Sequence, residues 1–432
     1  MSLFKDTVVT FISKAATIVL GIGLACAAAW LLGPEGRGQL AIYNVLAVLL
    51  VLVTSVGVEM AGAYYAGTRK YGLPEVIMGI LIITAVSLLA ATAIGYLLWI
   101  WQPGFIAKIT GRGLIISVIF VPAVLLFTSI WYIHMALGHM KTYCLGEIIN
   151  GMIALTGVLV LCWNTRIPEY VILSRIIGLL ITLVIFLFVL ARKNKIVTFG
   201  ISWRCIKDLY KYGVKYCLGR IADFFSGQIG TVIIIFLGST AEIGYFAVAV
   251  ALTSKLVLLP SVLLAVLLSR VVEHQENSIG LVARAVRVTF WMLLFVSLVL
   301  GAFCKPIVMV ALSPKFLPSV VPILIMLPGM TVKCCSKVLG IYFNGVGRPE
   351  INSIALTASV PANIILMYFL LPVYGIVGAA LATTLGYLVE AVALLIYYKL
   401  AFNHPLSLLV PRTCDIAELF SVVYKRLYSL RK

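Results

Sequence analysis

Twelve apolar stretches recur along the 432-residue chain, and each is long enough to cross a bilayer as a helix, which takes about 20 residues. Only 11% of the residues are charged, against about a quarter in soluble domains. The sequence therefore predicts an all-α polytopic membrane protein and excludes a soluble enzyme, a disulfide-built secreted module and a disordered chain. The predicted spans are roughly 8–32, 39–66, 75–101, 114–137, 143–163, 168–191, 212–237, 243–268, 284–304, 316–343, 351–371 and 374–400.

The basic residues are distributed unequally between the predicted loops. With the N-terminus inside, 22 Lys and Arg fall on the inner side, 6 on the outer side and five deep within spans. Because cytoplasmic loops collect Lys and Arg, this predicts a plasma (inner) membrane protein with both termini in the cytoplasm. The same bias explains the net charge of +18, so no nucleic-acid partner is expected. The nine Cys include no CxxC pair and are expected to be reduced.

A weak internal repeat indicates two related halves. The basic stretch 192–211 follows the sixth span and divides the chain six plus six. Parallel repeats of this kind are found in transporters. We therefore expect two six-helix bundles, residues 1–200 and 201–400, around a central cavity. The repeated residues are Leu32-Gly33 with Gly38-Gln39-Leu40-Ala41, and Leu237-Gly238 with Gly244-Tyr245-Phe246-Ala247.

Two segments depart from simple spans. Pro318, Pro322 and Pro328 lie in or near the span 316–343, where we expect a kinked or broken helix. In the tail 401–432, apolar and basic residues alternate at helical spacing from Arg412 onward. That pattern predicts a basic amphipathic helix on the cytoplasmic membrane surface, with a frayed basic tail as the alternative.

Enzyme signatures do not occur in the sequence. It contains no GxxxxGK[ST], HExxH or GxSxG motif, and its four His are dispersed. The longest predicted outer loop, around 102–113, has only about a dozen residues, which leaves little room for a catalytic site. We therefore expect a transporter without a catalytic residue, resident metal or cofactor, with H⁺ or Na⁺ as the coupling ion.

The charges inside the spans are the candidate functional residues. A charge at the bilayer centre is costly, at least about 2.5–3.5 kcal/mol, so it usually faces a cavity or a partner. The excess of cations predicts an anionic substrate, and the apolar remainder suits a lipid chain. Glu59 is the candidate for ion coupling. The candidate substrate-binding residues are Lys14, Arg220, Asp223, Lys255, Lys333 and Lys337.

Structural interpretations of these charges remain open. Arg220 and Asp223 share a helix face and could neutralise each other. Lys14, Lys333 and Lys337 could extend their ammonium groups to an interface, as could the guanidinium of Arg175. The acids Glu59, Glu147 and Glu390 could be ion-pair partners of Lys14 or Arg175.

Several motifs, spread over residues 13–400, resemble the polysaccharide transporter family, the Wzx-like O-antigen flippases of the multidrug/oligosaccharidyl-lipid/polysaccharide (MOP) superfamily. Residues 30–38, WLLGPEGRG, are similar to the family's aRLLGPEGrG stretch, although Trp30 stands where the family often has Arg. Residues 371–384, LPVYGIVGAALATT, are similar to the family's P-x-yGivGAAlATt. The remaining matches are residues 345–349 (GVGRP), Asn363, and Asp223 followed by Leu237-Gly238 and Gly244-Tyr245.

The resemblance implies movement of an undecaprenyl-pyrophosphate-linked oligosaccharide from the cytoplasmic to the outer leaflet. Its cationic cavity maps onto Arg220, Asp223 and Lys255, and less clearly onto Lys14, Lys333 and Lys337. The expected partners are the lipid-linked substrate, membrane lipids, a polysaccharide polymerase and other biosynthesis proteins. The alternatives are a multidrug/cation antiporter of the same superfamily and a membrane glycan polymerase or ligase.

Overall fold

The computed structural model of the chain describes residues 3–101, 108–194, 200–260, 278–346, 348, 350–402, 405–412 and 415. Within these residues the secondary structure is helical and contains no strand, which confirms the predicted all-α fold class. The helices, in chain order, are α1 (Leu3–Thr54), α2 (Val58–Thr68), α3 (Leu73–Trp101), α4 (Gly111–Ala136), α5 (Met140–Thr165), α6 (Pro168–Asn194), α7 (Trp203–Leu237), α8 (Thr240–Thr253), η2 (Ser254–Val257), α10 (Ser278–Ala302), α11 (Cys304–Ile307), η4 (Val308–Leu312), η5 (Pro314–Ser319), α12 (Val320–Gly345), α13 (Glu350–Phe402) and η6 (Leu406–Leu408).

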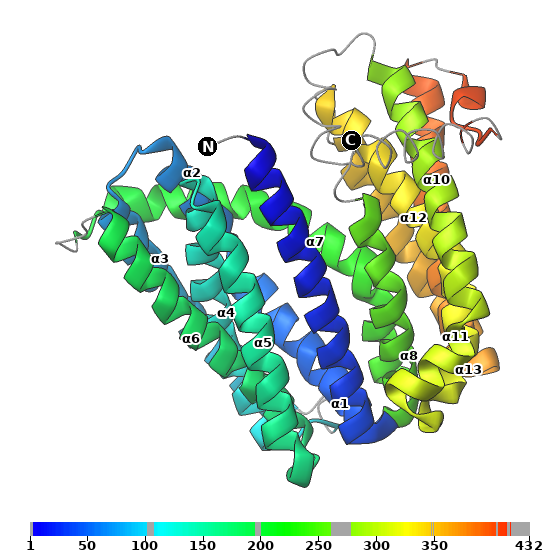
Figure 1. The fold of residues 1–432 in the computed structure, drawn as a ribbon, viewed down its shortest axis with the longest axis horizontal. Helices are drawn as coiled ribbons and strands as arrows, with labels where there is room; N and C mark the ends of the chain where they lie inside the picture. The colour runs from blue at the N-terminus through cyan, green and yellow to red at the C-terminus, as the bar shows by residue number, and fades with distance from the viewer. Residues whose placement is uncertain are drawn as a thin grey trace, which may run out of the picture. The chain divides into compact units, whose positions relative to one another are not determined.

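The chain forms two compact units. The first comprises Met1–Asp223, Ile234–Ala247 and Ala311–Lys315, and the second comprises Phe224–Ile233, Val248–Val310 and Phe316–Lys432. In the first unit α1 packs against α4, α5 and α6, while α4 also contacts α2 and α3. In the second unit α12 packs against both α10 and α13 (Figure 1). The predicted division of the bundles at residue 200 stays a prediction.

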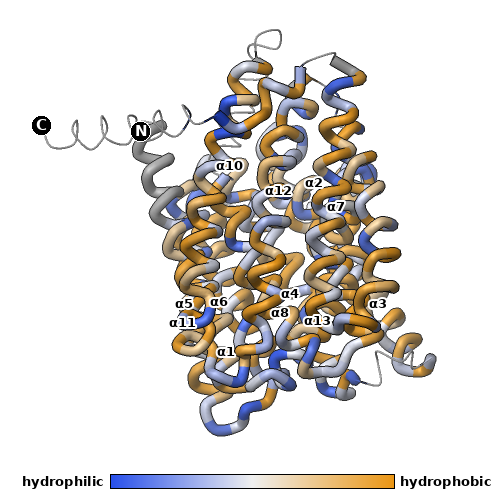
Figure 2. The backbone as a smooth tube through the Cα atoms, turned by 90° about the vertical axis from the view of Figure 1, so that its right-hand side faces the viewer, coloured by the Kyte–Doolittle hydropathy of each residue, from blue (hydrophilic) through white to orange (hydrophobic). Residues whose placement is uncertain are grey.

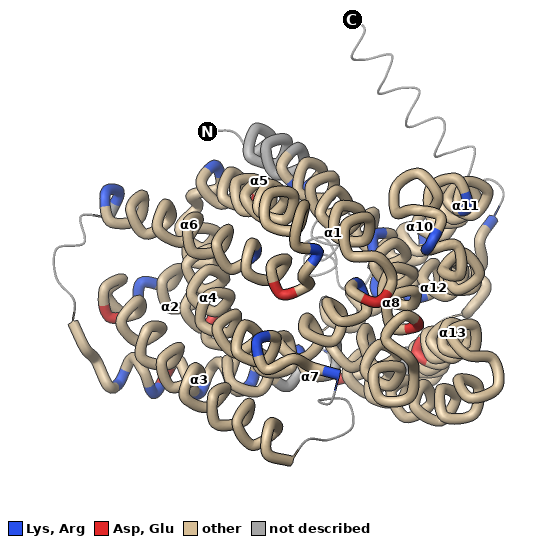
Figure 3. The backbone as a smooth tube through the Cα atoms, turned by 90° about the horizontal axis from the view of Figure 1, so that it is seen from below, with Lys and Arg blue, Asp and Glu red and all other residues tan. Residues whose placement is uncertain are grey.

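Among the described residues, nine helices are long and apolar enough to cross a membrane. Figure 2 shows hydrophobic residues along most of the helix lengths, and Figure 3 shows how sparse Lys, Arg, Asp and Glu are on them. Of the nine, α13 contains two predicted spans, and α1 contains the first predicted span together with most of the second, 39–66, which ends in α2. The predicted span 212–237 lies in α7, whose apolar part is Gly227–Leu237.

The chain reverses direction within α1. Gly33 has φ 68° and ψ −175°, a left-handed φ that glycine adopts without a Cβ clash. On either side of it, the Trp30 ring lies 6.3 Å from the Trp163 ring, and the Tyr43 hydroxyl donates to Glu169 at 3.1 Å. Both limbs therefore approach the junction of α5 and α6, so the helix assigned as α1 contains the first predicted span and most of the second. The rest of the second span lies in α2, because the helix is interrupted at residues 55–57.

A second reversal divides α13. Gly375 has φ 56° and ψ −137°. Asn352, near the start of α13, donates its side-chain amide to the Gly340 carbonyl at 2.8 Å. The ring of Tyr398, near the end of α13, lies 6.4 Å from that of Tyr342. Both ends of α13 therefore meet the same end of α12, as two antiparallel spans joined at Gly375 would.

The predicted interruption near residues 316–343 lies before the helix. The 3₁₀ turn η5 contains Pro318, and α12 then runs from Val320 through Pro328 to Gly345 without a break. Pro322 falls in the first turn of α12, where a backbone N–H would have no helical partner, so it costs no hydrogen bond. The expected break therefore lies at the start of the span, between η5 and α12, and not within α12. A kink within α12 stays a prediction. The predicted amphipathic tail, 401–432, lies mostly outside the described residues, which here are 401–402, 405–412 and 415.

The glycines of the internal repeat pack against each other in the first unit. A Cβ on Gly38 would collide with the carbonyl of Thr240 and lie 3.1 Å from the Gly244 nitrogen. Reciprocally, a Cβ on Gly244 would collide with the carbonyl of Pro34 and lie 3.1 Å from the Gly38 nitrogen. The two repeat motifs thus meet backbone to backbone, a contact that any side chain would prevent.

Candidate functional site

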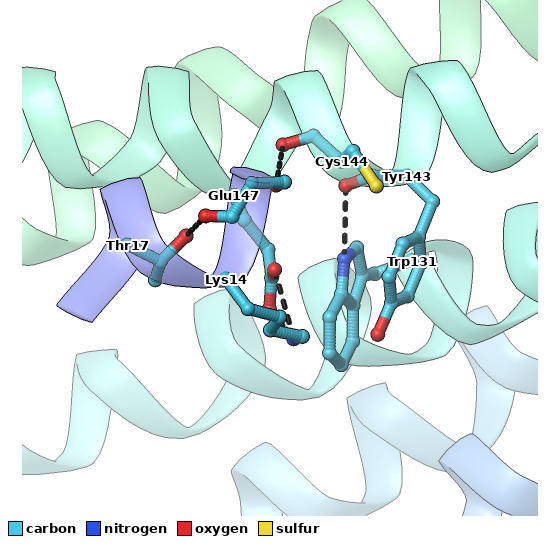
Figure 4. A network of polar contacts seen from close by, with 7 residues as sticks. Lys14, Thr17, Trp131, Tyr143, Cys144 and Glu147 are labelled. Atoms are coloured by element: carbon cyan, nitrogen blue, oxygen red, sulfur yellow. Dashed lines mark hydrogen bonds and ion pairs between the residues drawn. The ribbon is translucent and has the colours of Figure 1, made fainter. Parts of the chain in front are cut away.

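Lys14, in the first unit, forms an ion pair with Glu147. Its Nζ is 2.6 Å from Glu147 Oε1 and 2.9 Å from Oε2 (Figure 4). The same ammonium lies 5.3 Å from the ring centroid of Trp131 and 5.4 Å from that of Tyr143, distances at which aromatic rings attract a cation. The pairing of Lys14 with an acid is the structural alternative that the sequence left open.

A small cavity lies beside this ion pair, between α1, α4 and α5. Its volume is about 190 Å³, and its walls are mostly apolar, with Glu147 and Asn150 among the polar members. The Oδ1 atom of Asn150 is buried without a hydrogen-bond partner. The other lining residues are Thr17, Leu20, Gly21, Leu24, Phe127, Thr128, Trp131 and Gly151.

A second ion pair joins α2 to α7. Arg220 Nη1 donates to Oε1 of Glu59, and only 6% of the Glu59 side chain is exposed, against 29% of that of Arg220. The second carboxylate oxygen of Glu59 is buried without a hydrogen-bond partner. A buried carboxylate with one free oxygen can accept a proton or ligate a small cation, which is the chemistry that ion coupling needs.

The second unit holds the remaining predicted cations. Lys333 is 4% exposed, and its Nζ lies 4.2 Å from the ring centroid of Tyr387. Lys337 lies one turn after Lys333 on the same helix, α12, and α13 carries the buried acid Glu390 three residues after Tyr387. Lys255 lies in η2, which contacts α12 within the same unit.

The predicted site residues therefore fall into two groups. Lys14, Glu59 and Arg220 belong to the first unit, and Lys255, Lys333 and Lys337 belong to the second. Arg220 pairs with Glu59, whereas the side chain of Asp223, its predicted partner, lies outside the described residues. The residues that sequence reasoning left out of the site are Trp131, Tyr143, Glu147, Asn150, Tyr387 and Glu390. For Glu147 and Glu390 the signal was present, because each is an acid in an apolar span.

One polar cluster lies outside the membrane-spanning segments. Asp208, near the start of α7, accepts hydrogen bonds from Lys70 Nζ at 2.7 Å and from the Tyr71 hydroxyl at 2.6 Å. The bond from Lys70, followed by that from Tyr71, lowers the pKa of Asp208 below its ordinary value. An ion pair and a hydrogen bond in this cluster therefore connect the loop after α2 to α7.

Comparison with known proteins identifies the architecture. The chain superimposes on the lipid II flippase MurJ in its inward closed conformation with a TM-score of 0.71, 16% identity and coverage of 98% of this chain and 93% of that one. It also superimposes on an inward-facing multidrug resistance MATE family transporter of the MOP superfamily, with a TM-score of 0.62, 15% identity and coverage of 93% and 95%. The chain has the fold of MOP superfamily transporters.

Comparison of sequences identifies fewer relatives than comparison of structures does. No protein-family model matches the chain. An uncharacterized membrane protein, MJ1068 of Methanocaldococcus jannaschii, is 26% identical over 194 residues. The match covers 44% of this chain and 38% of that relative, so the chain spans less than half of the relative's length. The MOP fold thus rests on structural likeness, and membership of a Wzx-like family stays a prediction.

Proposed function

We propose that the protein is a flippase that moves an undecaprenyl-pyrophosphate-linked oligosaccharide from the cytoplasmic to the outer leaflet by ion-coupled alternating access. The observation that carries the proposal is a set of cations inside membrane-length apolar helices, with Lys333 at 4% exposure as the clearest case. Such charges are retained in membranes mainly for function. An anionic headgroup on a lipid chain matches both the cations and the apolar surroundings.

The cations have separate roles in this proposal. Arg220, Lys255, Lys333 and Lys337 would bind the pyrophosphate or acidic sugars, and Lys14 would contribute through its cluster with Glu147. Asp223 would tune the charge of Arg220. Glu59, with a free and buried carboxylate oxygen, would couple transport to H⁺ or Na⁺. The protein would act in the plasma (inner) membrane, with both termini in the cytoplasm, beside a polymerase and other polysaccharide biosynthesis proteins.

A multidrug/cation antiporter is the second candidate, because the structural likeness extends to a MATE family transporter. Such a protein would need acids facing its substrate. In the described structure Glu147 and Glu59 each pair with a cation, which favours the flippase.

The deciding experiment reconstitutes the purified protein in liposomes that contain a fluorescent undecaprenyl-pyrophosphate glycan. Quenching of the probe in the outer leaflet measures the fraction that crosses. We expect translocation by the wild type, its loss in Lys255→Ala, and normal rates in the control Lys315→Ala, which removes an exposed cation. Full translocation by Lys255→Ala would remove the role assigned to this residue. Efflux of a cationic dye without lipid translocation would favour the antiporter, and joining of glycans would favour the polymerase or ligase.

A further inference from the structure

The first turns of α7 separate two chemically different faces. Cys205, Leu209 and Gly213 recur every four residues and are buried. They pack on the first unit: Leu209 reaches within 2.7 Å of the Cβ position of Gly79, and Gly213 meets the backbone at Gly57. This side of α7 is therefore buried against the first unit, and the opposite side of the helix does not take part in that packing.

The opposite side is basic and aromatic. We define it as the basic face of α7, formed by Trp203, Arg204, Lys207, Tyr210, Lys211 and Lys215, all of which are exposed. Trp203 is 75% exposed and Tyr210 is 54% exposed. At 3.6 residues per turn these six positions cover one continuous side of the helix. Trp and Tyr are the aromatic residues that membrane–water interfaces favour, and Lys and Arg accompany them on the cytoplasmic side.

The nearby acid does not neutralise this face. Asp208 is bound by Lys70 and Tyr71, so its carboxylate already has a cation and a hydroxyl as partners. Among the residues that the structure describes, no acid forms an ion pair with Arg204, Lys207, Lys211 or Lys215. This part of α7 also lies at one end of the first unit, because it contacts the loops before and after α2, and Figure 1 shows it running across the neighbouring helix ends.

We propose that the basic face of α7 binds the headgroups of anionic phospholipids in the leaflet next to it. The four cations pair with the lipid phosphates, while the rings of Trp203 and Tyr210 lie among the glycerol and upper acyl groups. Charge complementarity identifies the occupant, because a neutral lipid offers no net negative charge to four cations. The inference does not depend on which substrate the protein carries.

The test compares lipid retention by four-fold charge variants of the full-length protein. One variant carries R204Q, K207Q, K211Q and K215Q, and the matched control carries R112Q, R166Q, K305Q and K315Q, which also removes four exposed cations. Each purified protein is equilibrated with equal amounts of phosphatidylglycerol and phosphatidylcholine, and the retained lipids are counted by native mass spectrometry. We expect the wild type and the control to retain more phosphatidylglycerol than phosphatidylcholine. In the α7 variant the ratio of retained phosphatidylglycerol to phosphatidylcholine should be lower by a factor of about ten or more.

Three results would overturn the proposal: no preference in the wild type, an unchanged preference in the α7 variant, or an equal loss in the control. A positional readout keeps the proposal testable if the α7 variant misfolds. Brominated phosphatidylglycerol should quench the fluorescence of Trp203, measured as the difference between wild type and Trp203→Phe, more than brominated phosphatidylcholine does. Equal quenching by the two lipids would also contradict it.

Discussion

Gly38 and Gly244 are 206 positions apart in number but meet backbone to backbone, and each would place a Cβ 3.1 Å from the nitrogen of the other. Both belong to the internal repeat: Gly38 is five residues, and Gly244 six residues, after the glycine of a Leu-Gly pair. The repeat therefore coincides with a packing contact. It preserves a contact in which each half supplies the glycine that the other half requires.

Alanine at Gly38 or Gly244 should prevent normal packing of the first unit. The added methyl group would collide with a carbonyl of the facing segment, Thr240 or Pro34, and backbone cannot move aside as a side chain can. We expect a loss of about 3 kcal/mol or more, the upper part of the range for overpacking. Thermal unfolding of the detergent-solubilised protein measures it. Gly280→Ala is the control, because nothing lies within 4 Å of its Cβ position. Normal melting of both repeat variants would contradict the contact.

Removal of Arg220 should destabilise the protein more than removal of both members of its ion pair. Arg220→Met leaves the Glu59 carboxylate buried without a partner, which typically costs about 3–5 kcal/mol. The double variant Glu59→Gln with Arg220→Met removes the buried charge and should recover most of that loss. A double-mutant cycle on melting in detergent measures the coupling. Additive effects of the two changes would show that the pair does not act as a unit.

The sequence predicted what depends on local pattern. Apolar length identified the spans, and Gly33 and Gly375 lie at reversals that the predicted span ends had already placed nearby. The interruption expected around Pro318, Pro322 and Pro328 lies at η5, before α12, and Pro322 does not break α12 because a proline in a first helical turn loses no hydrogen bond.

Partners across helices could not be predicted in the same way. Lys14 and Glu147 are separated by 133 positions, and Arg220 and Glu59 by 161. Helical spacing relates only residues within a few turns of each other, which is why Asp223 was the expected partner of Arg220. Which helices pack side by side is a property of the whole bundle. The sequence therefore identified the buried charges but left most of their partners open.

The ring of Tyr387 should contribute to the affinity for the transported substrate, because it contacts the ammonium group of Lys333. The ammonium of Lys333 lies 4.2 Å from that ring centroid, and a desolvated cation–π contact contributes about 2 kcal/mol. Tyr387→Leu removes the ring and should lower the apparent affinity for the lipid-linked substrate about tenfold or more. Tyr387→Phe keeps the ring and should stay near the wild type. The liposome translocation assay at several substrate concentrations separates the two, and equal loss in both variants would assign the effect to the hydroxyl instead.

The Asp208 cluster should make stability depend on pH in the acidic range. Hydrogen bonds from Lys70 and Tyr71 lower the pKa of Asp208 in the folded protein below its value of about 3.9 in the unfolded chain. The unfolded state therefore binds a proton first as the pH falls, so the stabilisation is complete above about pH 4 and is lost as the pH falls through the folded pKa. Because Lys70 and Asp208 are partly exposed, the effect on the melting temperature should be at most about 2 °C.

Melting curves between pH 3 and pH 7 should show this decrease in melting temperature at acidic pH in the wild type, and Asp208→Asn should lack it. The variant Glu35→Gln, which changes an exposed acid elsewhere in the first unit, is the matched control and should keep the wild-type pH profile. An Asp208→Asn profile that is superimposable on the wild type would show that the cluster does not contribute to stability.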